Sequence, residues 1–232
     1  MLKTEYRNLL RSRFLAGALI GGLLLGSTPA WAHSLPTHIP EKQLHEMRVE
    51  PTAVSAFQLT DQHGRLFDQA RLQGRWHLVM FGFTSCPDIC LVHMNHLAAM
   101  RKQLLEQGYQ EWALPVVVLV TVDPKRDTPE RLGAYVQNFH KDFLGVTGSP
   151  EEIARLEKAL GGSHRTFSED VDGHYEVLHT SSVYAINPQG ELVARIQPPF
   201  NGAKLAAHFD SLRKEAGLAP ETGFPQEGHH HP

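Results

Sequence analysis

Two cysteines carry most of the chemistry that this sequence could support. Cys86 and Cys90 are the only cysteines among its 232 residues, and three residues separate them. Four positions correspond to about one helical turn, so the two sulfurs can share a face and form either a disulfide or a joint metal site. Rapid disulfide cycling usually uses a shorter spacing, whereas this spacing suits two thiolates that converge on one soft cation. Cu(I) is the natural candidate for such a pair.

The segment Phe83–Cys90 favours ionised thiols. It follows an apolar run and precedes a helical pattern, which places both sulfurs at a strand-to-helix junction. Free amide groups and the helix dipole at such a junction stabilise a thiolate, so we expect both sulfurs to ionise easily. A structural disulfide is the alternative, but a bridge across so short a loop contributes little stability.

Two thiolates leave a metal ion under-coordinated, so a third ligand is expected from elsewhere in the chain. His179 is the best candidate, because it lies directly before an apolar strand in a loop that could reach the cysteine loop at the same sheet edge. A single histidine is nevertheless more often a surface group than a ligand. The residues alone therefore leave both roles of His179 open.

His93 is the rival ligand on geometric grounds. A helical wheel places it on one stripe with both cysteines and with apolar core positions further along the predicted helix. Because those later positions are buried, we expect His93 to point under the sheet rather than into the site. His96 lies off this stripe and is expected to face solvent.

The N-terminus predicts export. Four basic residues precede an apolar stretch over residues 14–26, and Ala30-Trp31-Ala32 fits a cleavage site. Residues 1–32 are therefore interpreted as a signal peptide or, if uncleaved, an N-terminal membrane anchor, although the apolar run is shorter than the roughly 18 residues of a spanning helix. The protein is expected to be periplasmic or exported, with an uncleaved signal anchoring it to the inner membrane. A thiol pair in an oxidising compartment favours a redox or metal role.

The remaining patterns predict a three-layer α/β domain with a central mixed sheet flanked by helices. Continuous apolar runs predict two buried strands, and shorter runs around a turn predict a hairpin to which a further strand adds. Helical patterns follow capping residues such as Thr128. Strands are expected at 77–83, 115–122, 175–177, 183–186 and 192–196, and helices at 90–107, 128–140, 149–160 and 203–216.

One folded domain is expected over residues 53–217, with soft ends on both sides. Residues 33–52 are rich in proline and lack an apolar period, which indicates a flexible arm. Residues 218–232 are interpreted as a disordered tail whose histidines either collect metal loosely or are simple polar groups. The formal net charge is −3 and no polybasic block occurs, so no nucleic-acid partner is expected.

Four ordered motifs resemble the Sco/SenC family. They are Phe81–Cys90 with both cysteines, Asp123–Pro129, Gly145–Gly148, and Tyr175–Gly190 with His179, and the resemblance covers about residues 53–215. The chain departs from the family at Leu91, where the family usually has proline. This departure leaves the expected ligands intact but could change how the helix starts.

The resemblance implies a thioredoxin-like fold and a copper protein that helps to build the binuclear copper site of cytochrome c oxidase. It also implies that Cys86, Cys90 and His179 bind copper, as Cu(I), Cu(II) or both. The expected partner is a copper-accepting oxidase subunit or another copper chaperone, and a monomer is expected. Asp123 and Asp127 are interpreted as residues that shape the neighbouring loop or tune the site, without being ligands.

Two functions remain in different classes. A metallochaperone would pass its copper by ligand exchange and needs no bond-making catalysis, so it would not be an enzyme. A periplasmic thiol:disulfide oxidoreductase would use Cys86 and Cys90 to keep acceptor cysteines reduced, and His179 would then be dispensable. A peroxidase is a distant third, because no separate peroxidatic cysteine is left over.

Overall fold

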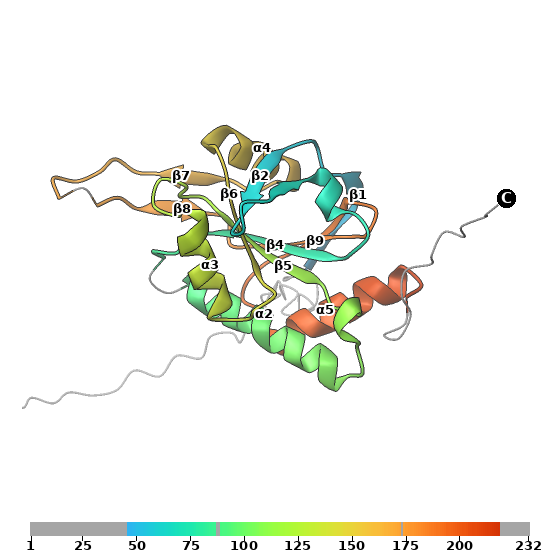
Figure 1. The fold of residues 1–232 in the computed structure, drawn as a ribbon. Coiled ribbons are helices and arrows are strands. Elements are labelled where there is room, and N and C mark those ends of the chain that lie inside the picture. Colours follow the sequence, from blue (N-terminus) through green and yellow to red (C-terminus); the bar gives the residue numbers. More distant parts are fainter. Residues whose placement is uncertain (1–45, 87–88, 173, 219–232) are drawn as a thin grey trace, which may run out of the picture. The chain divides into compact units, whose positions relative to one another are not determined.

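An eight-stranded mixed sheet organises the part of the chain that the computed structural model describes, residues 46–86, 89–172 and 174–218 (Figure 1). Its strands are β1 (Glu46–Ala53), β2 (Gln58–Asp61), β3 (Leu66–Asp68), β4 (His77–Gly82), β5 (Val116–Thr121), β6 (Leu144–Thr147), β9 (Val183–Ile186) and β10 (Glu191–Ile196). They are ordered β1-β10-β9-β4-β5-β6-β2-β3. Strand β4 pairs in parallel with β5, and β5 with β6, whereas the other neighbours are antiparallel.

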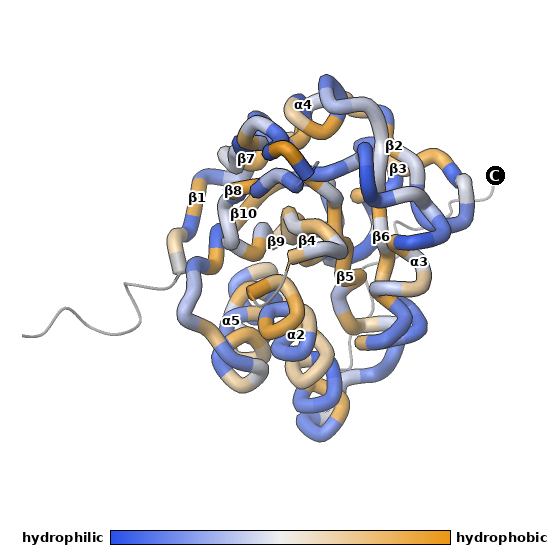
Figure 2. Tube along the Cα trace, turned by 90° about the vertical axis from the view of Figure 1, so that its left-hand side faces the viewer, coloured by the Kyte–Doolittle hydropathy of each residue, from blue (hydrophilic) through white to orange (hydrophobic). Residues whose placement is uncertain are grey.

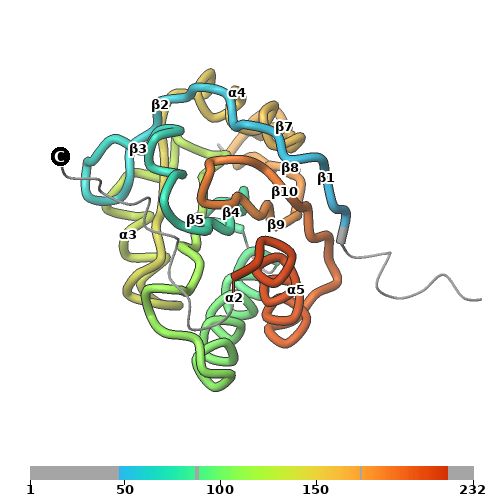
Figure 3. The backbone as a smooth tube through the Cα atoms, turned by 90° about the vertical axis from the view of Figure 1, so that its right-hand side faces the viewer, coloured from blue at the N-terminus to red at the C-terminus, as the bar shows by residue number. Residues whose placement is uncertain are grey.

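Helices cover both faces of this sheet, which confirms the predicted three-layer α/β architecture. The α-helices are α2 (Ile89–Glu106), α3 (Pro129–Gln137), α4 (Pro150–Leu160) and α5 (Gly202–Glu215), and two 3-10 turns are η1 (Gln69–Leu72) and η2 (Glu111–Ala113). Helices α2 and α5 lie side by side on one face, and α4 lies on the other (Figures 1 and 3). None of the described helices is both long enough and apolar enough to cross a membrane.

The continuous apolar run at β4 divides its side chains between two cores. Leu78 and Met80 pack with α2, α3 and α5, whereas Val79 and Phe81 pack with α4 and the β2–β3 edge. All six residues of β4 are buried. Such a strand is apolar on both faces because helices cover both, as expected for the parallel centre of a sheet. Hydrophilic residues gather instead in the peripheral loops (Figure 2).

The helix starts follow the predicted capping residues. The side chain of Thr128 accepts a hydrogen bond from the Arg131 amide, and Pro129 occupies the first turn of α3. Ser149 caps α4 in the same way. Helix α2 begins at Ile89, so Leu91 lies in its first turn with an exposed side chain.

The expected flexible arm over residues 33–52 ends in a strand, which corrects that prediction for its last part. Residues of β1 pair antiparallel with β10 at the edge of the sheet, and the register shifts between Arg48 and Thr52. Pro51 lies inside this irregular stretch, where a missing amide donor is tolerated at a sheet edge. The signal at 1–32, the rest of the arm to residue 45 and the tail beyond residue 218 lie outside the described residues.

The strand expected at 175–177 also needs correction. It lies two residues further on, as β8 (Val177–His179), and it pairs with β7 (His164–Thr166) in a separate two-stranded ribbon rather than with β10. The prediction failed because β7 is short and polar, so its sequence gave no strand pattern. The ribbon places His179 opposite His164 in register and carries it to the sheet edge where β4 ends.

Candidate metal centre

Three side chains from two distant segments meet beyond the end of β4. Cys86 lies in the loop after this strand, Cys90 lies in the first turn of α2, and His179 is the last residue of β8. Their ligand atoms all lie within 4.8 Å of one another. The Sγ atom of Cys90 is 3.6 Å from Nε2 of His179. The structure therefore brings together all three residues that the sequence nominated as ligands.

The ring of His179 is held in the tautomer that a metal ligand requires. Its Nδ1 lies 3.1 Å from the carbonyl oxygen of Thr180, which can only accept, so Nδ1 carries the proton. Nε2 is left with a free lone pair directed towards Cys90. The ring of Phe83 meets the imidazole edge-on, with centroids 5.8 Å apart. Burial lowers the pKa of His179, so the ring is neutral near pH 7.

The two thiols lie in different environments. Both are free, and Cys90 is buried whereas Cys86 is half-buried. Burial raises the pKa of the Cys90 thiol, and its contact with Cys86 and the nearby Asp127 carboxylate raise it further. The expectation that both sulfurs ionise easily is therefore wrong for Cys90, because desolvation outweighs the helix start. Its S–H donates to His179 until a cation displaces the proton.

Gly82 makes room for the buried sulfur. A Cβ atom at this position would lie 3.1 Å from Sγ of Cys90 and 2.9 Å from Cδ1 of Leu119. Both distances are shorter than ordinary packing contacts, so a larger residue at the end of β4 would force Cys90 or Leu119 to shift. The close approach fixes Cys90 against the end of the strand.

Asp127 ties the cysteine loop to the neighbouring loop. Its buried carboxylate accepts hydrogen bonds from the amide and hydroxyl groups of Thr84 and from the hydroxyl of Thr121. Arg131 donates to the hydroxyl groups of Thr84 and Ser85. Four of these hydrogen bonds hold Thr84 and Ser85, the two residues directly before Cys86. They support the expectation that Asp127 shapes the site without being a ligand.

Asp123 supports the segment that leads to His179. Its carboxylate accepts a hydrogen bond of 2.7 Å from the hydroxyl of Tyr175 and forms an ion pair with Arg126. The Arg126 guanidinium also stacks over the ring of Tyr175, 3.9 Å from its centroid. Because Tyr175 leads into β8, this cluster connects the loop after β5 to the strand that carries His179.

His93 does not join the ligand cluster. It is buried and packs against Phe200, with ring centroids 4.6 Å apart, as expected for a residue that points under the sheet. Burial lowers its pKa to about 4. His96 is only half-exposed and also lies near Phe200, so the expectation of a solvent-facing side chain is only partly right.

Sequence reasoning missed the supporting residues Phe83, Thr84 and Tyr175. All three fall inside the motifs that suggested the site, and Thr84 precedes the first cysteine by two positions. Their position inside these motifs was the signal that could have marked them as residues of the site. Only the fold shows that Thr84 meets Asp127 and that Tyr175 meets Asp123, because each pair is separated by more than 40 positions.

The donor set fits a soft or borderline metal ion. Two thiolates and a neutral imidazole are the ligands that Cu(I), Cu(II) and Zn²⁺ accept, whereas Mg²⁺ and Ca²⁺ prefer oxygen. Carboxylates lie outside the cluster, where they contact the loops instead. The half-buried Cys86 gives the site one accessible side.

Comparisons with known proteins agree with this arrangement. The SCO1/SenC family model matches residues 45–214. The mitochondrial protein SCO2 homolog of Bos taurus is 35% identical over 183 residues, which cover 78% of this chain and 67% of that protein. The solved structure of Arabidopsis thaliana ScoI with copper bound is 30% identical, with a TM-score of 0.64 over 70% of this chain and 99% of that chain.

A third relative has a structure that identified a disulfide switch. This protein, BsSco, is described as a member of the Sco family of cytochrome c oxidase assembly proteins. It is 25% identical, with a TM-score of 0.53 over 72% of this chain and 94% of that chain. These structural neighbours confirm the thioredoxin-like fold expected from the motifs. From its sequence, its fold and its cysteine–histidine cluster, the chain belongs to the SCO1/SenC family.

Proposed function

We propose that this protein is a copper metallochaperone that binds one copper ion through Cys86, Cys90 and His179. The observation that carries the proposal is the convergence of the two sulfurs and Nε2 within 4.8 Å. The copper-bound structure of a relative with the same fold supports copper as the ion. The site holds Cu(I), Cu(II) or both, because thiolates favour the first and imidazole accepts either.

The three ligands have different parts in loading and release. Cys90 loses its proton when copper binds, so loading releases a proton from a buried thiol. The neutral ring of His179 needs no deprotonation near pH 7. Cys86 is the more accessible of the two sulfur donors to an incoming protein, because it is half-buried whereas Cys90 is buried. Ligand exchange therefore begins where an acceptor thiolate replaces Cys86.

The acceptor in this proposal is the binuclear copper site of cytochrome c oxidase, in an oxidase subunit, or another copper chaperone. Support comes from the relative described as an oxidase assembly protein. Exposed apolar side chains also flank the ligands, with Ile89 and Leu91 on α2 and Leu178 beside His179. They form a surface that a protein partner could cover during transfer. An exported, monomeric protein without nucleic-acid partners fits this role.

A transfer assay tests the proposal. The copper-loaded protein is mixed with a reduced, copper-free soluble domain of the oxidase subunit, and formation of the binuclear centre is followed by its absorption. Native protein is expected to assemble the centre, whereas His179→Ala, which loads copper poorly, is expected to fail. If free copper and loaded protein assembled the centre equally, or if His179→Ala matched native protein, the chaperone role would be contradicted.

The thiol:disulfide oxidoreductase remains the second candidate, because two free thiols lie close enough to react with each other after a small movement. Cys86 would attack an acceptor disulfide and release one acceptor thiolate. Cys90 would then attack the mixed disulfide, release the second acceptor sulfur and pass its proton to it. Two electrons move to the acceptor, and a Cys86–Cys90 disulfide remains.

One variant separates the two functions. His179→Ala removes a copper ligand but leaves both thiols, so it should abolish copper transfer and retain disulfide reduction. Reduction of the oxidised acceptor domain, measured by thiol release, provides the readout. Cys86→Ser should lose both activities. An enzyme role gains support only if His179→Ala reduces the acceptor at the native rate and that rate exceeds the rate with free dithiols.

A further inference from the structure

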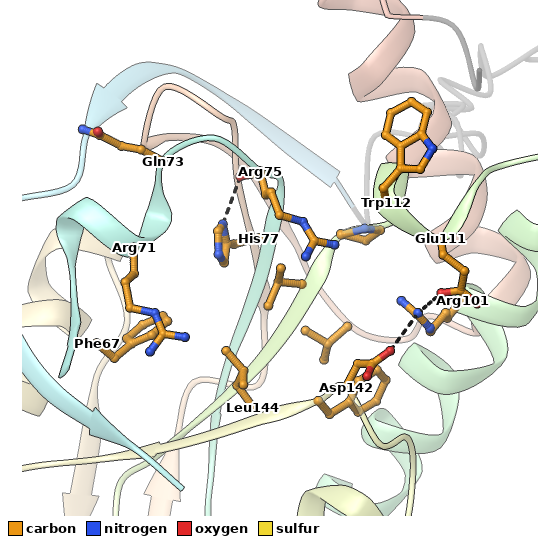
Figure 4. A pocket seen from close by; sticks show the side chains of 14 residues that line it. Phe67, Arg71, Gln73, Arg75, His77, Arg101, Glu111, Trp112, Asp142 and Leu144 are labelled. Carbon is orange, nitrogen blue, oxygen red and sulfur yellow. Dashed lines mark hydrogen bonds and ion pairs between the residues drawn. The ribbon is translucent and has the colours of Figure 1, made fainter. Parts of the chain in front are cut away.

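A cavity of about 530 Å³, drawn in Figure 4, opens where the central strands begin. His77 and Val116, the first residues of β4 and β5, line it. The metal ligands lie beyond Gly82, the last residue of β4. At about 3.3 Å per residue, the length of this strand separates the two places by roughly 17 Å. The cavity is therefore separate from the proposed copper site.

Arginines supply the positive charge of this cavity. Arg71, Arg75 and Arg101 line it, together with the carboxylates of Glu111 and Asp142. His77 adds no charge near pH 7, because burial lowers its pKa to about 4. The lining thus carries three guanidinium groups and two carboxylates.

Arg101 and Arg71 are both matched to carboxylates. Arg101 is buried and contacts Glu111 and Asp142, so it takes up both acidic groups of the lining (Figure 4). Arg71 forms an ion pair of 2.9 Å with Asp61, which is buried outside the cavity. Burial alone would raise the pKa of Asp61, but hydrogen bonds from Arg65, Arg71 and His63 lower this pKa to about 2. Both arginines therefore have structural partners.

Arg75 forms no ion pair within 4.0 Å in the described part of the chain, and Asp142 attracts it only from a longer distance. Its guanidinium donates a hydrogen bond of 3.2 Å to the carbonyl oxygen of Leu114. Burial lowers the pKa of Arg75 and repulsion from Arg101 lowers it further, whereas attraction to Asp142 raises it. A guanidinium beside another cation, with most of its donors unused, is well suited to a carboxylate or phosphate, which it can bind through two parallel hydrogen bonds.

Apolar side chains complete the cavity. Val116, Phe143 and Leu144 line it, together with Trp112, whose side chain is exposed. Figure 4 shows Leu144 and Trp112 among the lining residues. A volume of this size matches pockets that hold small organic ligands. A bare inorganic anion would leave this apolar wall unused.

We propose that this cavity binds a small organic anion, whose carboxylate or phosphate group contacts Arg75 and whose apolar body packs against Val116 and Leu144. The two anionic groups share the same recognition chemistry, namely a planar fork of N–H donors. Glu111 opposes such a ligand, because its carboxylate adds negative charge to the same lining.

Two probes test this proposal and separate the two anionic groups. Phenyl phosphate and benzoate are titrated separately into ¹⁵N-labelled full-length protein in a buffer without phosphate or carboxylate. The indole N–H of Trp112 and the amides of Val116 and Leu144 report binding by nuclear magnetic resonance. At least one probe is expected to shift these signals saturably, and the probe that binds more tightly identifies the preferred group.

Matched variants decide whether Arg75 is responsible. Arg75→Gln is expected to weaken binding about tenfold, as loss of a charged hydrogen-bonding partner predicts. Arg155→Gln removes an exposed arginine that is paired with Glu152 on α4, and it should leave binding unchanged. Glu111→Gln should strengthen binding about twofold or more, since it removes an exposed carboxylate from the lining.

The proposal is overturned if neither probe gives saturable shifts, or if Arg75→Gln binds as tightly as native protein. Should Arg75→Gln fail to fold, Glu111→Gln decides alone: unchanged or weaker binding contradicts the proposal. Copper binding by Cys86 and Cys90 is expected to be unaffected in all three variants. A failure of either proposal therefore leaves the other standing.

Discussion

The Sγ atom of Cys90 lies 3.6 Å from Nε2 of His179, although 89 positions separate these residues in the chain. The contact joins the first turn of α2 to the last residue of a two-stranded ribbon. Neither element makes the site alone. Gly82 leaves space for Cys90, and the hydrogen bond from Tyr175 to Asp123 holds the chain that leads to His179. These two features can be tested separately.

Replacing His179 with alanine should weaken copper binding by about 100-fold or more, because loss of an outer partner alone typically weakens a metal site 10- to 100-fold. The sulfur-to-Cu(II) charge-transfer band should weaken as well. Copper titration against a competing chelator measures both effects. His174→Ala provides the control, since His174 is an exposed histidine in the turn of the same ribbon. Equal losses in both variants would show that the ribbon, rather than the ligand, is responsible.

Replacing Gly82 with alanine should disturb Cys90 directly. The new methyl group would lie 3.1 Å from Sγ, so the sulfur or the strand must move. We expect the free energy of unfolding to fall by about 1–3 kcal/mol, as for other overpacked cores, together with a lower copper affinity. Chemical denaturation and copper titration give the two values.

Gly202→Ala is the matched control for this prediction. A Cβ at Gly202 would meet Ala99 at 2.7 Å, where α5 packs on α2 away from the ligands. It should destabilise the fold by a similar amount and leave copper affinity unchanged once the protein is folded. If Gly82→Ala kept native copper affinity, the close packing of Gly82 against Cys90 would not be needed for the metal site.

Replacing Tyr175 with phenylalanine tests the support beside His179. The hydroxyl donates to Asp123, and burial followed by this hydrogen bond raises the pKa of Tyr175 to about 12. Its loss should lower the free energy of unfolding by about 1–2 kcal/mol. Copper should also dissociate several-fold faster, because the strand carrying His179 is held less firmly.

Tyr135→Phe serves for comparison. The hydroxyl of Tyr135 is buried without a hydrogen-bond partner in the described part of the chain. Its removal should leave stability unchanged or raise it. If stopped-flow measurements gave the same copper dissociation rate for Tyr175→Phe as for native protein, Tyr175 would have only a local structural role.

Copper affinity should rise with pH. Burial raises the pKa of Cys90, so its thiol is protonated in the free protein at neutral pH and loses one proton when copper binds. Each proton displaced changes the Kd about tenfold per pH unit, so between about pH 6 and pH 8 the Kd should fall at least tenfold for each unit of increase.

The variants predict different slopes in this experiment. His179→Ala should keep the slope above about pH 7, because the pKa of His179 lies below its ordinary value and the ring is already neutral. Cys90→Ser should lower the slope by about one proton. A pH-independent Kd for native protein would mean that Cys90 binds as an already ionised thiolate.

The sequence predicted those parts of the fold that depend on local pattern. The apolar runs at β4 and β5 and the capping residues Thr128 and Ser149 act over a few positions, and the structure confirms them. Strand β1 was missed because Pro51 disguises it, and its stability comes from pairing with β10, about 140 positions away along the chain.

The sequence predicted which residues form the site, but it did not predict their pKa values. The two cysteines were evident from their spacing, whereas His179 became a strong candidate only through its motif. The high pKa of Cys90 could not be predicted, since burial beneath Cys86 and nearness to Asp127 arise from packing that no local pattern encodes. The same is true of His93, whose neighbour Phe200 lies more than 100 positions further on.

X-ray absorption at the copper edge of the loaded, reduced protein would measure the ligands of the copper ion themselves. We expect one copper per chain with two sulfur neighbours and one imidazole nitrogen, and loss of the nitrogen contribution in His179→Ala. A native spectrum with only nitrogen or oxygen neighbours, or one unchanged by His179→Ala, would contradict the copper site formed by Cys86, Cys90 and His179.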